Sequence, residues 1–147
     1  MEKGFDNLMV PFMDNLIAVR QAVKTFFQRR IKELDSDISY EMFQVLNVLW
    51  RKNEVNQQEI ANAVQKGKAS LTPLIDNLVK LQLVTRTEDS VDRRNKIITL
   101  TKEGQAFQKK MDPIFNDFYT QFGAGLSEKE IQTATIMLSK ILSQVNN

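Results

Sequence analysis

Apolar side chains in the first part of the chain recur three or four positions apart. They occupy Phe5, Leu8, Phe12, Leu16, Val19, Val23 and Phe26. This spacing places them on one face of an α-helix, so the pattern predicts a long amphipathic helix from Phe5 to Leu34. Pro11 has no N–H to donate and is expected to mark a kink or a later start of this helix. A second helix is predicted from a Ser39 cap to about Trp50.

Residues 56–81 predict two short helices joined by a sharp turn. Asn56-Gln57-Gln58-Glu59 matches a capping box with Asn as the cap, which predicts a helix start. Gly67 is expected to take the positive φ that the turn needs. The next helix is expected to start near residues 69–70, because Pro73 is tolerated only in a first turn. Two helices in this arrangement are typical of a helix-turn-helix.

Two β-prone runs follow the helix-turn-helix. Leu83–Glu88 and Lys96–Leu100 are rich in Val, Ile and Thr, which favours strands. Asp89–Arg94 between them contains no glycine, so an open loop is expected instead of a tight two-residue turn. The fold class predicted is therefore mainly α with a small β-hairpin wing, that is, a winged helix-turn-helix flanked by N- and C-terminal helices.

The last third of the chain predicts two more helices. Thr101 is expected to cap the first, Gly123-Ala124-Gly125 to end it, and Ser127–Glu130 to open the second as a capping box. The first and last helices of the chain carry more apolar residues than a short DNA reader needs. Their apolar faces could close within one chain as a monomer, but we favour pairing in a homodimer. The domains expected are residues 1–38 and 105–147 for dimerisation and residues 39–104 for DNA binding.

The amino-acid composition limits the catalytic and metal-binding chemistry that the chain can perform. The 147-residue chain is 42% hydrophobic, enough for a packed core, and contains neither cysteine nor histidine. These absences exclude a thiolate nucleophile, a Ser-His-Asp triad and a zinc site built from His or Cys. Its five glycines form no phosphate-binding loop, so an enzyme is not expected, and no cofactor is expected either. No signal peptide or membrane-spanning run is recognisable, which predicts a cytoplasmic protein.

Basic residues gather on the segment that resembles a DNA reader. Residues 51–110 hold 12 Lys and Arg against 7 Asp and Glu, whereas the rest of the chain is acidic on balance. Clustered cations of this kind favour phosphate contacts, although they can also be an ordinary solvated surface. The candidate DNA-binding residues are Gln57, Lys66, Lys68, Ser70, Leu71, Thr72, Pro73, Asn77, Asp92, Arg93, Arg94 and Lys96.

Each candidate has a plainer alternative. Ser70 could reach a base edge or only cap its helix, and Lys66 could contact a phosphate or only be solvated. In the hairpin, Asp92 could pair with Arg94 and hold its guanidinium extended for a narrow minor groove. The alternative there is an exposed ion pair of little energetic value.

Nine residues from Leu78 onward stand at characteristic spacings: Leu78, Leu83, Val84, Arg86, Asp92, Arg94, Leu100, Thr101 and Gly104. With these residues in register, the segment Leu78–Thr101 resembles the MarR family of winged helix-turn-helix repressors. Val79 and Gln82 depart from it, because the family usually has Glu and Gly there. The turn after the recognition helix must therefore form without its habitual glycine.

The resemblance implies a specific function. A homodimeric repressor would bind a pseudo-palindromic double-stranded DNA operator, with Arg94 as the wing arginine that enters the minor groove. The stretch SLTPLIDNL is similar to a branch that includes organic-peroxide sensors, but without cysteine this chain cannot sense through a thiol. The rival interpretation is a winged helix that binds another protein and no DNA.

Release by a small apolar or aromatic effector is also implied by the resemblance. The aromatic residues that could line such a pocket are Phe12, Phe43, Trp50 and Phe115. Aromatic residues at helical spacing are more often plain core, and that alternative stays open at this point.

Overall fold

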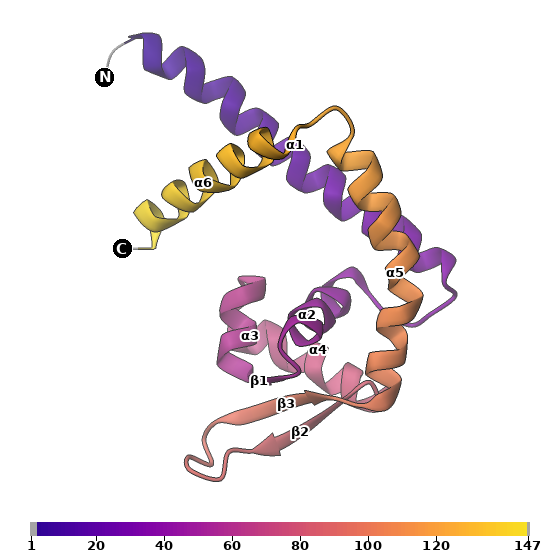
Figure 1. Cartoon of the computed structure of the whole chain (residues 1–147). Helices are drawn as coiled ribbons and strands as arrows, with labels where there is room; N and C mark the ends of the chain where they lie inside the picture. The colour runs from indigo at the N-terminus through magenta and orange to yellow at the C-terminus, as the bar shows by residue number, and fades with distance from the viewer. Residues whose placement is uncertain (1–2, 147) are drawn as a thin grey trace. The chain divides into compact units, whose positions relative to one another are not determined.

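The computed structural model describes residues 3–146, which form six helices and three strands. In chain order these are α1 (Lys3–Glu33), α2 (Tyr40–Arg51), β1 (Glu54–Asn56), α3 (Gln57–Val64), α4 (Lys68–Lys80), β2 (Val84–Glu88), β3 (Lys96–Leu100), α5 (Lys102–Gly123) and α6 (Glu128–Val145). The predicted fold class is confirmed: α3 and α4 form the helix-turn-helix and β2–β3 the wing. Figure 1 shows the wing beneath α2, α3 and α4, with its loop at the end farthest from the start of α5.

The chain divides into two compact units, residues 1–114 and residues 115–147, so the boundary falls within α5. The first unit contains the whole winged helix-turn-helix together with α1. The predicted boundaries after residues 38 and 104 concern the roles of the segments in an assembly and stay a prediction. No helix among residues 3–146 is both long and apolar enough to cross a membrane.

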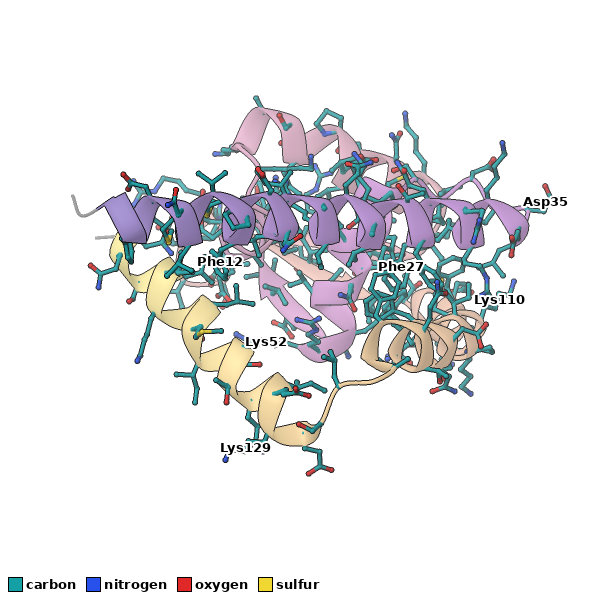
Figure 2. All side chains as sticks on the ribbon, turned by 90° about the horizontal axis from the view of Figure 1, so that it is seen from above. Phe12, Phe27, Asp35, Lys52, Lys110 and Lys129 are labelled. Carbon is teal, nitrogen blue, oxygen red and sulfur yellow. The ribbon has the colours of Figure 1, made fainter. Side chains whose placement is uncertain are left out.

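Helix α1 starts at Lys3 and continues through Pro11, so the expectation of a later start is wrong. Figure 2 labels Phe12 and Phe27 along this helix and Asp35 just beyond its end. The C-terminal part of α1 buries Phe27 and Ile31, whereas its N-terminal part leaves large apolar side chains such as Leu8 exposed. One helix thus contributes to the core with one half and presents an apolar surface with the other.

The core of the first unit is built around α2. Ser39 caps this helix as predicted, because its Oγ accepts a hydrogen bond from Met42 N at 3.1 Å. The fully buried side chains come from α1, α2, α3, α4, the strands and α5: Ile31, Val45, Leu46, Leu49, Ile60, Leu71, Ile75, Leu78, Val84, Ile98 and Met111. Burial of one such side chain contributes roughly 1.5–3 kcal/mol, so α3, α4 and the wing are held on a common apolar support.

A third strand, β1, was not predicted. It pairs antiparallel with β3, with Val55 opposite Ile98, and the strand order in the sheet is β1-β3-β2. Asn56 ends β1 and also caps α3, accepting from Gln58 N at 2.7 Å. The expected return bond from Glu59 is absent among the described residues, since Glu59 pairs with Lys52 instead. Strand β1 therefore ties the start of α3 directly to the wing.

The turn of the helix-turn-helix differs from the prediction. Gln65 has a φ of 54° and Gly67 has a φ of −66°, so the left-handed residue is Gln65 and the expectation for Gly67 is wrong. Gly67 is instead the N-cap of α4, which begins at Lys68 and not at residues 69–70. Pro73 consequently lies beyond the first turn, where it removes one backbone hydrogen bond from the helix.

Gln82, at the turn from α4 into β2, has a φ of 60°. The left-handed conformation costs a residue with a side chain roughly 1–2 kcal/mol, and glycine avoids this cost but has a more flexible unfolded state. We therefore expect Gln82→Gly to raise the free energy of unfolding by about 0.5 kcal/mol. A urea titration followed by circular dichroism measures the change, and a lower unfolding midpoint would contradict the assigned strain.

The second unit contains the C-terminal part of α5 and all of α6. Ser127 and Glu130 form the predicted capping box, because Ser127 Oγ accepts from Glu130 N and Glu130 Oε2 accepts from Ser127 N. No described residue of α6 is buried, and apolar side chains such as Leu142 and Val145 are exposed. This helix therefore presents exposed apolar side chains along its length.

Candidate nucleic-acid interface

Helix α4 separates its buried and exposed residues clearly. Leu71, Ile75 and Leu78 face the core, whereas Lys68, Ser70, Pro73 and Asn77 are exposed. Leu71 is fully buried, which removes it from the set of candidate DNA contacts. The other predicted residues of this helix remain available to a ligand, with Thr72 half-buried beside them.

The wing loop carries the predicted pair. Arg94 Nε donates to Asp92 Oδ1 at 3.1 Å and Arg94 Nη2 donates to Asp92 Oδ2 at 3.2 Å, a bidentate contact. Asp92 Oδ1 also accepts from Arg94 N at 3.1 Å. These bonds to Arg94 lower the pKa of the Asp92 carboxyl below its ordinary value, side-chain bonding being the larger cause. The guanidinium is thus held in one orientation at an exposed tip.

Two further ion pairs fix the wing. Arg86 on β2 pairs with Asp76 on α4, and Lys96 Nζ on β3 lies 2.9 Å from Glu88 Oε1 on β2. The first pair joins the wing to the recognition helix, so the two candidate DNA-contacting elements are held together. Arg86 was missing from the predicted site residues, although its place in the family pattern was a signal for it.

A cleft of about 240 Å³ lies where these elements meet. Its lining residues come from the start of α3, the start of α4 and both wing strands: Asn56, Gln57, Gln58, Ala61, Lys68, Leu71, Thr72, Arg86, Arg94, Asn95 and Lys96. Four of them carry positive charge. The structure therefore brings five of the candidate DNA-binding residues together: Gln57, Lys68, Thr72, Arg94 and Lys96.

Gln57 is placed differently from the expectation. It was predicted to contact DNA directly, but the residue is only 8% exposed. Its Nε2 donates to Thr72 Oγ1 at 3.3 Å, which links α3 to α4. Lys66 in the turn and Arg93 in the wing loop lie nearer solvent, and neither has an ion-pair partner within residues 3–146.

The aromatic residues predicted for an effector pocket have mixed surroundings. Phe43 is buried with its ring 4.9 Å from that of Phe27, and Trp50 Nε1 donates to Gly104 O at 3.1 Å. Phe43 therefore belongs to the core, the alternative left open by the sequence, whereas Trp50 is half-buried. Phe12 on α1 is half-buried, and Phe115 belongs to the second unit. None of the four lines the cleft described above, and the effector site stays a prediction.

Among residues 3–146, no group of three or more Asp, Glu, His or Cys side chains could hold a metal ion. The site is therefore a basic groove between a helix and a hairpin. Its chemistry suits the binding of a polyanion.

Comparison with known proteins agrees with this geometry. Residues 38–96 match the MarR family model. The HTH-type transcriptional regulator SarZ of Staphylococcus aureus (strain MRSA252) is 28% identical over 110 residues, which are 75% of this chain and 73% of SarZ.

Two solved structures are similar over nearly the whole chain. MepR of S. aureus in its DNA-binding conformation has a TM-score of 0.82 at 25% identity, covering 91% of this chain and 98% of MepR. AbfR of Staphylococcus epidermidis has a TM-score of 0.84 at 22% identity, covering 99% of this chain and 97% of AbfR. AbfR bound to DNA is also similar, with a TM-score of 0.76. The likeness to AbfR concerns the fold alone.

Proposed function

Because the chain is a MarR-type winged helix-turn-helix regulator, we propose that it binds double-stranded DNA sequence-specifically as a homodimeric repressor. The observation that carries the proposal is the basic cleft between α4 and the wing, with a guanidinium fixed at the wing tip by Asp92. The similarity to SarZ, a transcriptional regulator, supports transcription regulation as the role, and the similarity to MepR in its DNA-binding conformation supports DNA binding. A regulatory role without enzymatic activity is therefore proposed for this chain.

Each subunit would place α4 in a major groove and its wing in the adjoining minor groove. Lys68, Ser70, Pro73 and Asn77 are the exposed residues of α4 that would face the DNA. A dimer with two-fold symmetry would then read a pseudo-palindrome whose half-sites lie about 10 bp apart, one helical turn of DNA.

Exposed apolar residues support the homodimer. The N-terminal part of α1 and the whole of α6 carry several of them: Phe5, Leu8, Val10, Ile17, Ile131, Ile136, Leu142 and Val145. Large exposed apolar surface is unusual in a monomer and typical of an interface. Pairing of these helices would leave the winged helix-turn-helix of each subunit free for DNA.

Regulation would follow from an effector that binds more tightly to one of two arrangements of the dimer's winged helix-turn-helix units. The proposed effector is small and apolar or aromatic. The second candidate function is a winged helix that binds another protein. The exposed apolar face of α6 would then be its docking surface.

Selection of bound duplexes from random DNA at fixed moderate salt tests the proposal. The expected result is an enriched inverted repeat together with a dimer in sedimentation equilibrium. A folded protein that enriches no sequence, and whose weak duplex affinity has no steep salt dependence, would favour the protein-binding function.

A further inference from the structure

Gln57 is the one polar residue buried among the described residues. It lies on the first turn of α3 at the wall of the basic cleft, and its Oε1 has no hydrogen-bond partner in the described chain. A buried amide with one unpaired atom destabilises a protein, and such a group calls for a functional explanation. An apolar side chain of similar size would fill the same space without that cost.

The partner of Gln57 points to the explanation. Thr72 Oγ1 accepts from Gln57 Nε2 at 3.3 Å and donates its own proton to Lys68 O at 3.0 Å. The carbonyl of Lys68 is part of the ordinary bonding of α4, so the hydroxyl proton is not needed there. Rotation about the Cβ–Oγ bond can redirect this proton to another acceptor while the bond from Gln57 stays in place. Hydrogen bonds in such a chain strengthen one another, so the amide makes the hydroxyl a better donor.

The cleft indicates which acceptor enters. When α4 lies in a major groove and the wing in the adjoining minor groove, one sugar–phosphate strand must pass between them. Thr72, Lys68 and Lys96 line the space between these two elements. Among residues 3–146, Lys68 has no ion-pair partner, so its charge is available to an anion in the cleft.

We propose that Gln57 and Thr72 form a relay that binds a backbone phosphate of DNA in this cleft. The inference rests on the proposed DNA-binding function and adds a specific site to it. Gln57 Nε2 donates to Thr72 Oγ1, and the Thr72 hydroxyl donates to a phosphate oxygen beside Lys68. Gln57 is therefore a positioning residue that does not itself touch the DNA. Burial fixes the orientation of the amide, so that Nε2 stays directed at the Thr72 hydroxyl.

Two substitutions distinguish loss of the relay from general destabilisation of the fold. Thr72→Val removes the hydroxyl with little change of shape, and Gln57→Met removes the donor with an apolar side chain of similar length. Each is expected to weaken duplex binding about tenfold per subunit, because a hydrogen bond to a charged group is lost or weakened. Gln57→Met is expected to keep or raise the urea midpoint, since the unpaired buried oxygen is removed.

Thr135→Val on α6 is the matched control. Thr135 Oγ1 donates to Ile131 O at 2.8 Å, the same bond to the carbonyl four residues earlier that Thr72 makes. Within residues 3–146, no side chain donates to the Thr135 hydroxyl as Gln57 donates to that of Thr72. Its substitution is expected to leave duplex affinity within twofold.

Salt dependence and sequence dependence identify the contact. A neutral hydroxyl releases no counterion, so Thr72→Val should leave the log–log salt slope unchanged, whereas Lys68→Gln should flatten it by about 0.9 per subunit. The loss from Thr72→Val should be equal for the selected operator and for a scrambled duplex, because a phosphate carries no sequence information. A loss confined to one base-pair position would show that Thr72 reads a base, and would overturn the relay.

A double-mutant cycle tests the coupling. In the Thr72→Val background, Gln57→Met should weaken binding less than twofold further. An equal tenfold loss in both backgrounds would overturn the relay. Inorganic phosphate is titrated in a separate experiment. If it shifts the NMR signal of the Gln57 side-chain amide to a plateau and also displaces the duplex, the cleft is a site for a free anion instead. If the unmodified protein binds no duplex, the proposed DNA-binding function is contradicted. If it binds and both single variants keep the same affinity, only the relay is contradicted.

Discussion

Arg94→Ala is expected to weaken operator binding by about 10- to 100-fold, a loss of roughly 1–3 kcal/mol per dimer. The guanidinium lies at the wing tip, with its side chain 91% exposed, and two bonds to Asp92 hold it extended. A narrow minor groove has an enhanced negative potential that attracts such a group. The fixed orientation reduces the entropy that binding must otherwise cost. Fluorescence anisotropy of a labelled operator duplex measures the change.

Matched substitutions separate charge from geometry. Arg94→Lys keeps the charge without the planar fork and should recover only part of the affinity, while Asp92→Asn should weaken binding less than Arg94→Ala. Arg93→Ala serves as the neighbouring control, because Arg93 lies in the same loop without an ion-pair partner in the described chain. Equal effects of Arg93→Ala and Arg94→Ala would show that only the total charge of the loop matters. Unchanged affinity in Arg94→Ala would contradict a wing contact with DNA.

The Asp92–Arg94 pair should persist over the pH range of such an experiment. The pKa of Asp92 is lowered in the folded protein by its bonds to Arg94. The pair is therefore fully formed above the ordinary pKa of an aspartate, about 4, and is lost only as the pH falls through the lower folded value. Changes in affinity between pH 6 and pH 8 cannot come from this carboxyl.

Local patterns sufficed for the helices and for the wing. The apolar spacing placed α1, α2 and α5 nearly at their observed bounds, and Ser39, Thr101 and Ser127 cap the helices that follow them. Caps and periodicity are properties of a few neighbouring residues, so the sequence contains them directly. The Asp92–Arg94 pair belongs to the same class, because its members are two residues apart.

Features that depend on distant residues were missed. β1 is only three residues long, so no alternation could reveal it, and it exists because β3 offers a free edge. The burial of Gln57 follows from the packing of α3 against α4, which no single helix pattern contains. Gln65 takes the left-handed conformation that was expected of Gly67, because α3 already ends at Val64 and its C-cap is two residues before the glycine.

Gly104, one of the residues in the family pattern, lies where the backbone of α5 approaches the backbone of the turn after α4. A Cβ built at this position would lie 2.2 Å from Leu83 O and 3.0 Å from Leu100 Cδ2. Leu83 O also accepts from Thr101 N at 3.1 Å, and Gly104 O accepts from Trp50 Nε1 at 3.1 Å. The start of α5 is thereby joined to the turn after α4 and to α2. Only glycine permits so close an approach of backbone to backbone.

Gly104→Ala is therefore expected to lower the free energy of unfolding by about 2–3 kcal/mol, the upper part of the range for overpacking a core. The added methyl group must push α5 away from Leu83 O, since that oxygen belongs to backbone and cannot move as a side chain does. Urea unfolding followed by the fluorescence of Trp50, the single tryptophan of the chain, measures the loss. The same signal should shift in the native state, because its indole N–H donates to Gly104 O.

Gly123→Ala is the control for this substitution. Gly123 lies near the end of the same helix, and a Cβ there would meet nothing within 4 Å. Alanine is a better helix residue than glycine by about 0.5–1 kcal/mol, so Gly123→Ala should keep or raise stability. An equal loss in both variants would mean that α5 tolerates no substitution and that the contact with Leu83 is irrelevant. A loss in Gly104→Ala alone means that the start of α5 packs directly on the turn that ends α4, a contact that tolerates no added methyl group.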